Sequence, residues 1–247
     1  MRFGLCCSYE DVTGALDAGF DYVELAASRL REQTSELSGV PVEATNLFFP
    51  SGFQLFGPGA DDAPAYGSKL FPIAASLGVR TMVIGSGAAR RAAAEQKADL
   101  AQSEFCRIAS ELSKMASEYG IVVAPESLNA TETDVGNRLS SLARELASLG
   151  TAYTADSYHV LAEWRSDHGT DWHPSSVDWA VELPTRPAHV HLASAERQAP
   201  QPGDASLAGF VQRLAELGYD GRVSLECSVK EAGMAQALRG AKSLFGC

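Results

Sequence analysis

Four residues of types that bind divalent metal ions recur at similar intervals through the second half of the chain. They are Glu126, Asp156, His191 and Glu226, separated by 30, 35 and 35 positions. Three carboxylates and one imidazole form a ligand set that suits Mn²⁺, Mg²⁺ or Co²⁺ and also accepts Zn²⁺. The spacing and residue types therefore predict one divalent-metal site formed by residues that are distant in sequence.

Each of these residues stands at or near the end of a short apolar run. The runs are IVVAPE (121–126), TAYTAD (151–156), AHVHL (188–192) and RVSLE (222–226). About 30 residues make one strand–helix unit of a (β/α)₈ barrel, where catalytic groups lie at the carboxyl ends of the strands. Taken singly, each carboxylate could be a solvated loop residue, and His191 a hydrogen-bonded barrel residue. The shared position at four successive strand ends favours the metal site.

A weak internal repeat indicates the elements that must position these residues. A glycine followed by a β-rich run occurs at 18–25, 77–84, 119–126, 149–156 and 217–226. Glycine supplies the left-handed residue that closes a helix, so each copy is the passage from a helix to the next strand. Segments 2–7, 42–49 and 188–192 bring the number of predicted strands to eight.

The segments between the strands show helical periodicity. Phe105, Ile108, Leu112 and Met115, for example, share one helix face. Alternating helices and apolar strands imply a parallel sheet, and eight strands imply that it closes. A chain of 247 residues has the usual size of one such barrel. We therefore expect an α/β fold, a (β/α)₈ TIM barrel, with a single domain over residues 1–247.

Composition excludes several classes of protein. A formal net charge of −11 argues against a nucleic-acid partner, and the only basic cluster, Arg90–Arg91, is interpreted as a solvated loop or helix start. Five cysteines without a CxxC pair indicate neither a disulfide framework nor a zinc ribbon. No run of 18 apolar residues and no signal-like start occurs, so we expect a soluble cytoplasmic protein without a membrane partner.

Several motifs resemble those of the sugar isomerase and epimerase family of xylose isomerase-like TIM barrels, above all the ketose 3-epimerases. They are VEL in the second predicted strand, GSGAARR (85–91), PESLN (125–129), ADSYH (155–159), HVHLASAER (189–197) and SLEC (224–227). The resemblance covers nearly the whole chain. It implies that Glu126, Asp156, His191 and Glu226 bind one divalent ion, with Mn²⁺ the first expectation and Mg²⁺, Co²⁺ or Zn²⁺ as alternatives. It also implies that Glu126 and Glu226 act as the acid–base pair.

The same resemblance implies substrate-binding roles for His159, Arg197 and Glu132. Without it, His159 could instead cap a helix start and Arg197 could be a solvated loop cation. His189 shares a strand face with His191, and we interpret it as packing behind the ligands, with a role as a further ligand as the alternative. Glu24, at the end of the second predicted strand, could point into the barrel mouth or hold a buried hydrogen bond.

The predicted activity is proton transfer through an enediolate on a small sugar or keto-sugar. A metal that spans a carbonyl and a neighbouring hydroxyl acidifies the C–H between them, and a carboxylate on each face can move the proton. The loops after the seventh and eighth strands lack a glycine-rich phosphate cradle, which favours an unphosphorylated carbohydrate, although Arg197 and Lys230 leave room for an anion. The sequence leaves a homodimer open.

Three alternatives remain. A metal-dependent dehydratase of a keto-sugar, keto-inositol or dehydroshikimate shares the first chemical step. A DNA-repair endonuclease of this superfamily is disfavoured for two reasons. A resemblance to such enzymes would imply a three-metal cluster with more histidines than the five in this chain, and DNA binding would need a basic groove. A non-catalytic sugar-binding barrel is disfavoured because the implied catalytic and substrate residues are all present.

Three segments show no periodicity and are expected as loops over the catalytic mouth. They are residues 51–67, 165–179 and 194–204, of which the second contains Trp172, His173 and Trp179.

Overall fold

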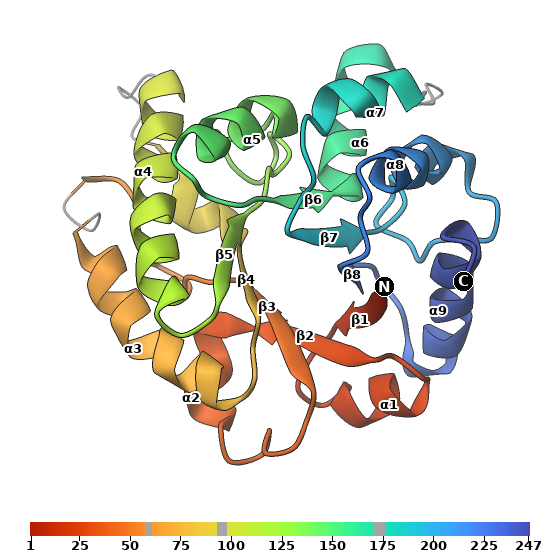
Figure 1. Cartoon of the computed structure of the whole chain (residues 1–247), viewed down its shortest axis with the longest axis horizontal. Helices are drawn as coiled ribbons and strands as arrows, with labels where there is room; N and C mark the ends of the chain where they lie inside the picture. The colour runs from red at the N-terminus through yellow and green to blue at the C-terminus, as the bar shows by residue number, and fades with distance from the viewer. Residues whose placement is uncertain (58–60, 93–97, 170–175) are drawn as a thin grey trace.

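Eight parallel strands form a nearly closed barrel with helices around its outside, in a computed structural model that describes all residues except 58–60, 93–97 and 170–175 (Figure 1). The strands follow the order β5-β4-β3-β2-β1-β8-β7-β6 in the sheet. A parallel bridge between Glu126 and Thr154 links the ends of β5 and β6. All eight predicted strands are confirmed, with bounds β1 Arg2–Cys6, β2 Tyr22–Ala26, β3 Val42–Asn46, β4 Thr81–Ile84, β5 Val122–Pro125, β6 Thr154–Asp156, β7 His189–Leu192 and β8 Arg222–Leu225.

The helices connect successive strands and cover the barrel from outside (Figure 1). In α4, the predicted apolar face is buried at Phe105, Ile108 and Leu112, while Met115 is partly buried against the core. The described helices are α1 Val12–Asp17, α2 Leu30–Gln33, α3 Asp62–Ser76, α4 Ala98–Ser117, α5 Leu139–Ser148, α6 Ser157–His168, α7 Ser176–Glu182, α8 Ala205–Glu216 and α9 Glu231–Leu244, with the short 3₁₀ turns η1 Ala27–Arg29 and η3 Gly87–Arg90.

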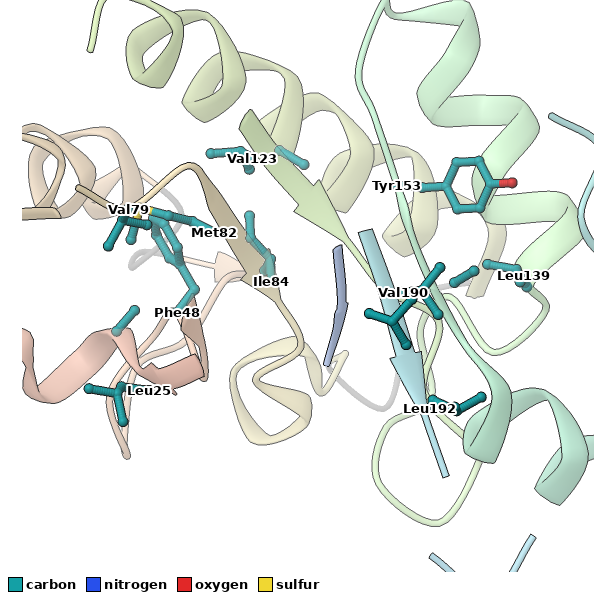
Figure 2. Packing of buried hydrophobic residues seen from close by; sticks show 14 of the residues in the cluster. Leu25, Phe48, Val79, Met82, Ile84, Val123, Leu139, Tyr153, Val190 and Leu192 are labelled. Atoms are coloured by element: carbon teal, nitrogen blue, oxygen red, sulfur yellow. The ribbon is translucent and has the colours of Figure 1, made fainter. Parts of the chain in front are cut away.

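The apolar core lies mainly between the strands and the surrounding helices. Figure 2 shows Met82 and Ile84 of β4, Val123 of β5, and Val190 and Leu192 of β7 among these buried side chains. Because apolar packing is concentrated outside the strands, the barrel interior can hold polar groups if each finds a partner. This division separates the part of the fold that supplies stability from the part that carries chemistry.

The expectation of three mouth loops holds only in part. Residues 194–204 form a loop, but α3 begins at Asp62, within the segment 51–67, and α6 and α7 occupy most of the described part of 165–179. Trp179 is fully buried, with its ring centroid 4.6 Å from that of Trp164 and 4.6 Å from that of Phe210. Assigning Trp179 to a mouth loop was wrong, because its large apolar surface is buried between helices. Trp172 and His173 lie outside the described residues.

None of the helices in the described ranges is both long and apolar enough to cross a membrane.

Candidate functional site

The structure brings the four predicted ligands together at the carboxyl ends of β5, β6, β7 and β8. One ligand-type atom from each of Glu126, Asp156, His191 and Glu226, here called the tetrad, lies within 4.8 Å of the others. Nδ1 of His191 is 3.0 Å from Glu126 Oε2, 3.7 Å from Asp156 Oδ2 and 3.5 Å from Glu226 Oε2. Since parallel strands end at one edge of the barrel, residues on four successive units converge there.

The tetrad fits a divalent cation on two observations besides its donor types. Asp156 Oδ1 caps the start of α6 by accepting from the backbone N–H of Tyr158 at 2.7 Å, whereas the buried Oδ2 has no hydrogen-bond partner among the described residues. A buried carboxylate oxygen without a donor implies a further partner, such as a cation. Gly85 lies so close that a Cβ there would come within 2.2 Å of Glu126 Oε1, so glycine leaves space for this carboxylate.

The buried tetrad brings carboxyl groups close together, and its electrostatics alter the pKa values of Glu226 and Asp156. Burial raises the pKa of Glu226 to about 8; His191 opposes the rise, and Glu126 and Asp156 add to it. Burial also acts to raise the pKa of Asp156, but His159 and His191 hold it below its usual range. A bound cation would supply positive charge that offsets the repulsion between these carboxylates.

Glu24 of β2 is completely buried behind the tetrad, which decides between the two roles left open for it. Its Oε1 lies 2.8 Å from His191 Nε2, and its Oε2 lies 2.8 Å from His189 Nε2. Burial raises the pKa of Glu24, but the two histidines outweigh this effect and lower it well below its usual value, so the carboxylate accepts from both rings. With Nε2 of His191 used as the donor, Nδ1 is the nitrogen that can bind a metal.

His189 therefore lies behind the ligands, as expected, and continues a buried polar chain. Its Nε2 is 3.3 Å from Ser224 Oγ, which in turn lies 2.9 Å from the hydroxyl of Tyr22. The chain runs from the tetrad into the barrel interior through side chains that are all buried. Such a network restrains the orientation of Glu24, and through it the imidazole of His191.

His159 directs one ring nitrogen toward the tetrad. Its Nδ1 accepts from the backbone N–H of Asn129 at 3.1 Å, which leaves the proton on Nε2. Nε2 is buried, lies 3.7 Å from Asp156 Oδ2 and has no hydrogen-bond partner within the described structure. The cap of α6 is Asp156, so the alternative role of His159 as the helix cap is wrong. An unpaired N–H beside the tetrad is suited to a substrate oxygen.

Arg197 and Glu132 also reach this region. Nη2 of Arg197 lies 2.8 Å from Glu226 Oε2, Nη1 lies 3.4 Å from Glu132 Oε1, and the guanidinium stands 4.7 Å from the centroid of the Tyr158 ring. The side chain is only 35% exposed, so Arg197 is an anchored cation rather than a freely solvated one. Its backbone is left-handed, with φ 55°, a conformation that costs roughly 1–2 kcal/mol for a residue other than glycine. Strain of this kind is typical of functional sites.

Arg90 was not predicted to contribute, and the interpretation of it as a solvated loop residue was wrong. It is fully buried, donates from Nη1 to the backbone carbonyl of Glu126 at 2.8 Å, and lies 4.6 Å above the Phe105 ring. Burial lowers its pKa to about 10, against the opposing effect of Glu126 and Glu132, so it stays charged at neutral pH. Its neighbour Arg91 is exposed. The sequence holds no signal that separates the two arginines.

A cavity of about 560 Å³ opens beside Glu226 and extends over the ends of β1, β2, β3 and β8. Arg197 and Asn46 line the cavity together with Glu226, and the Asn46 amide donates to Glu226 Oε1 at 3.4 Å. Asn46 is a second residue that sequence reasoning missed. Glu126 and Asp156 are buried and do not line the cavity. Glu226 is therefore the tetrad carboxylate that faces the space where a substrate would lie.

Several solved structures share this fold at low sequence identity. D-psicose 3-epimerase, crystallised in the presence of D-fructose, matches with a TM-score of 0.80 and 16% identity over 100% of both chains. The 3-keto-D-glucoside 4-epimerase YcjR from E. coli matches with 0.73 and 16%, again over 100% of both chains. The IOLI protein with a binding zinc atom matches with 0.70 and 14%, over 100% of this chain and 98% of the other.

Among curated proteins, no sequence matches the chain. The family model described as xylose isomerase-like TIM barrel matches residues 12–244, which is nearly the whole chain. The chain therefore belongs to the family of xylose isomerase-like TIM barrels.

Proposed function

We propose that this protein is a divalent-metal-dependent isomerase or epimerase that acts on a small, unphosphorylated sugar or keto-sugar. One observation carries the proposal: Glu126 and Glu226 both lie close to His191 Nδ1, at 3.0 and 3.5 Å, and complete a buried tetrad beside a cavity. Two carboxylates around one centre can remove a proton from carbon and return it. The fold shared with D-psicose 3-epimerase and with a 3-keto-D-glucoside 4-epimerase supports this class of reaction.

The tetrad would hold the ion, for which Mn²⁺ is our first proposal, and Zn²⁺ is supported by the zinc atom in the similarly folded IOLI protein. When bound, the metal would act as a Lewis acid that polarises the substrate carbonyl and so acidifies the neighbouring C–H. Sugar carbons are weakly acidic, so this polarisation is needed before a carboxylate can act as the base.

The protein groups then have distinct positions for proton transfer. Glu226 faces the cavity, and its carboxyl oxygens are held by Arg197 Nη2 at 2.8 Å and Asn46 Nδ2 at 3.4 Å. Glu126 belongs to the same tetrad but does not line the cavity, and its backbone carbonyl accepts from Arg90. We assign Glu226 and Glu126 as the acid–base pair. His159 Nε2–H and the guanidinium of Arg197 would donate to substrate oxygens, while Glu132 orients Arg197.

An unphosphorylated substrate is supported by the partners of the cavity cations. Arg197 is already paired with Glu226 and Glu132, and Arg29, at the outer edge, lies 3.9 Å from Glu32. A phosphate would have to compete with these carboxylates. A dehydratase shares the first proton abstraction, and no contact in the described structure favours expulsion of a hydroxyl, so it enters as an outcome of the test.

The test is exchange of carbon-bound hydrogen in D₂O, with Mn²⁺-loaded protein and a panel of free ketoses and keto-inositols. An epimerase or isomerase incorporates one deuterium into the substrate–product pool, and proton spectra locate it. Glu226→Gln should stop incorporation, whereas Glu111→Gln, at an exposed position on α4, should not. Loss of water as the dominant reaction would move the assignment to a dehydratase. No exchange with any compound would favour a sugar-binding protein without turnover.

A further inference from the structure

The cavity beside Glu226 has a large apolar part, and its volume is greater than a free hexose needs. Eight of the sixteen described residues that line it are apolar. Six of them, called here the apolar wall, come from β1, from the loops after β3 and β8, and from α9; they are Cys6, Cys7, Leu47, Cys227, Val229 and Met234. Thiols and thioethers are weak hydrogen-bonding groups that pack as polarisable apolar surface. This wall offers little to the hydroxyls of a sugar ring.

Leu47 is the most unusual residue of the apolar wall. It is 53% exposed, although it is a large apolar side chain, and its backbone is left-handed with φ 43°. Leucine rarely adopts this conformation, and such strain persists where the surrounding structure enforces it. Here Asn46, the preceding residue, is bonded to Glu226, and the carbonyl of Leu47 accepts from Ser28 N at 3.3 Å. The fold thus places an exposed apolar side chain at the cavity edge, next to a residue that contacts the tetrad.

Two further charged residues that line the cavity, Asp11 and Arg29, each have a partner within the protein. Asp11 accepts from Ser8 Oγ at 2.7 Å, and the guanidinium of Arg29 lies 5.3 Å from the centroid of the Tyr9 ring as well as near Glu32. Asp11 and Arg29 carry opposite charges, so this part of the cavity wall has no net charge. The outer part of the ligand is therefore expected to be uncharged.

The volume indicates a ligand of more than one sugar ring. At roughly 30 Å³ for each water-sized group, a cavity of about 560 Å³ holds about 19 such groups, compared with roughly twelve non-hydrogen atoms in a hexose. The hydrogen-bonding residues Glu226, Arg197 and Asn46 lie together at the end nearest the tetrad. The end of the cavity nearest the tetrad thus suits the polar, reacting ring, and the apolar wall suits an apolar substituent.

We propose that the cavity is an aglycone subsite and that the substrate is a keto-glycoside with an apolar aglycone rather than a free ketose. The proposal rests on the proposed function, because it places the reacting ring at Glu226. The aglycone would lie against the apolar wall and under Leu47. Its removal from water would then contribute to binding in proportion to its apolar area.

The test compares the affinities of two non-reacting ligands, phenyl and methyl β-D-glucoside, for the Mn²⁺-loaded protein by titration calorimetry. We expect the phenyl compound to bind at least about tenfold more tightly, as burial of one additional ring provides. Leu47→Asn removes the apolar side chain but suits left-handed backbone, and it should reduce this ratio to about threefold or less. Cys7→Ser, on the same wall, provides a second variant with the same expected direction. Leu100→Asn, at a 62% exposed position on α4, is the matched control and should keep the full ratio.

Equal affinities, no binding of either glycoside, or an unchanged ratio in both wall variants would overturn the subsite. The outcome can be separated from that of the proposed function. Deuterium exchange on free ketoses together with equal glycoside affinities would remove the subsite and leave the epimerase assignment. A preference for the phenyl compound that depends on Leu47, without exchange on any ketose or keto-glycoside, would keep the subsite and remove the assignment.

Discussion

Glu24 Oε1 and His191 Nε2 lie 2.8 Å apart, and both side chains are completely buried behind the tetrad. The second oxygen of Glu24 is used by His189, so the carboxylate cannot turn away without breaking a buried bond. His191 is held with Nδ1 toward Glu126, Asp156 and Glu226 by a residue 167 positions away in the sequence. A histidine oriented in this way by a carboxylate is a common arrangement behind metal ligands.

We expect Glu24→Gln to weaken metal binding by about 10- to 100-fold, the usual effect of losing a carboxylate behind a metal ligand. The glutamine amide accepts from only one ring and loses the charge that orients the other. Competition with a chelator measures the affinity. Glu43→Gln is the matched control, because Glu43 pairs with Arg2 and Arg222 away from the tetrad. Equal affinities in both variants would show that Glu24 does not orient the ligand.

One divalent ion per chain is expected on the tetrad. The double variant Glu126→Gln, Asp156→Asn should lose it, since two of three carboxylate ligands become neutral. Asparagine is also a good helix cap, so α6 should keep its start. Metal analysis after gentle purification gives the stoichiometry. Full occupancy in the double variant would place the ion elsewhere.

His159→Ala and Arg197→Ala should each lower turnover by roughly 10²-fold or more while leaving the metal content unchanged, because they remove donors to the substrate rather than ligands. Arg165→Ala serves as the control, since Arg165 pairs with Glu196 and contacts no tetrad residue in the described structure. Turnover is measured on a substrate identified by the deuterium-exchange test, and metal content is measured on the same preparations. Unchanged turnover in either variant would remove that residue from the proposed site.

Arg90→Met should lower activity by about tenfold or more, although its net effect on stability should stay within about 1.5 kcal/mol, the range of one hydrogen bond. Stability changes little because Nε and Nη2 of Arg90 are buried and have no hydrogen-bond partner among the described residues. The cost of desolvating the charge therefore offsets the bond to the Glu126 carbonyl. Activity changes because Glu126 loses its backbone tether. Denaturant unfolding and the pH–rate profile separate the two effects, and Arg90→Lys should restore part of the activity. A variant with the wild-type profile would assign Arg90 to packing alone.

The metal-free protein should lose stability as the pH rises from 7 to 9. The pKa of Glu226 is raised by burial to about 8, and that of His191 is raised well above its usual value by Glu24 and Glu226 against the effect of burial. The folded state therefore holds protons that the unfolded state has released, and stability falls until these groups titrate. Thermal unfolding with a chelator across this range tests it, and Glu226→Gln should flatten the dependence. A rise in stability over the same range would contradict the assigned pKa shifts.

The local pattern of the sequence was enough to predict the barrel and the meeting of the tetrad. Glycine followed by a β-rich run marks five of the passages from helix to strand, and these runs match strands of the barrel. Once eight parallel strands close, their carboxyl ends lie at one rim, so Glu126, Asp156, His191 and Glu226 come together whatever their separation in sequence. The meeting of the tetrad therefore follows from two things, the position of each residue at the end of its strand and the order of the strands in the barrel.

Only the tertiary structure decided which groups surround the tetrad. The sequence left two roles open for Glu24 and indicated a solvated position for Arg90, yet both are fully buried, because their partners come from other strands and loops. Asn46, the left-handed backbone of Leu47 and the direction of the cavity likewise depend on contacts between segments far apart in the chain. A side chain's periodicity reports the face of its own element, whereas its burial and its partners are set by what packs against that face.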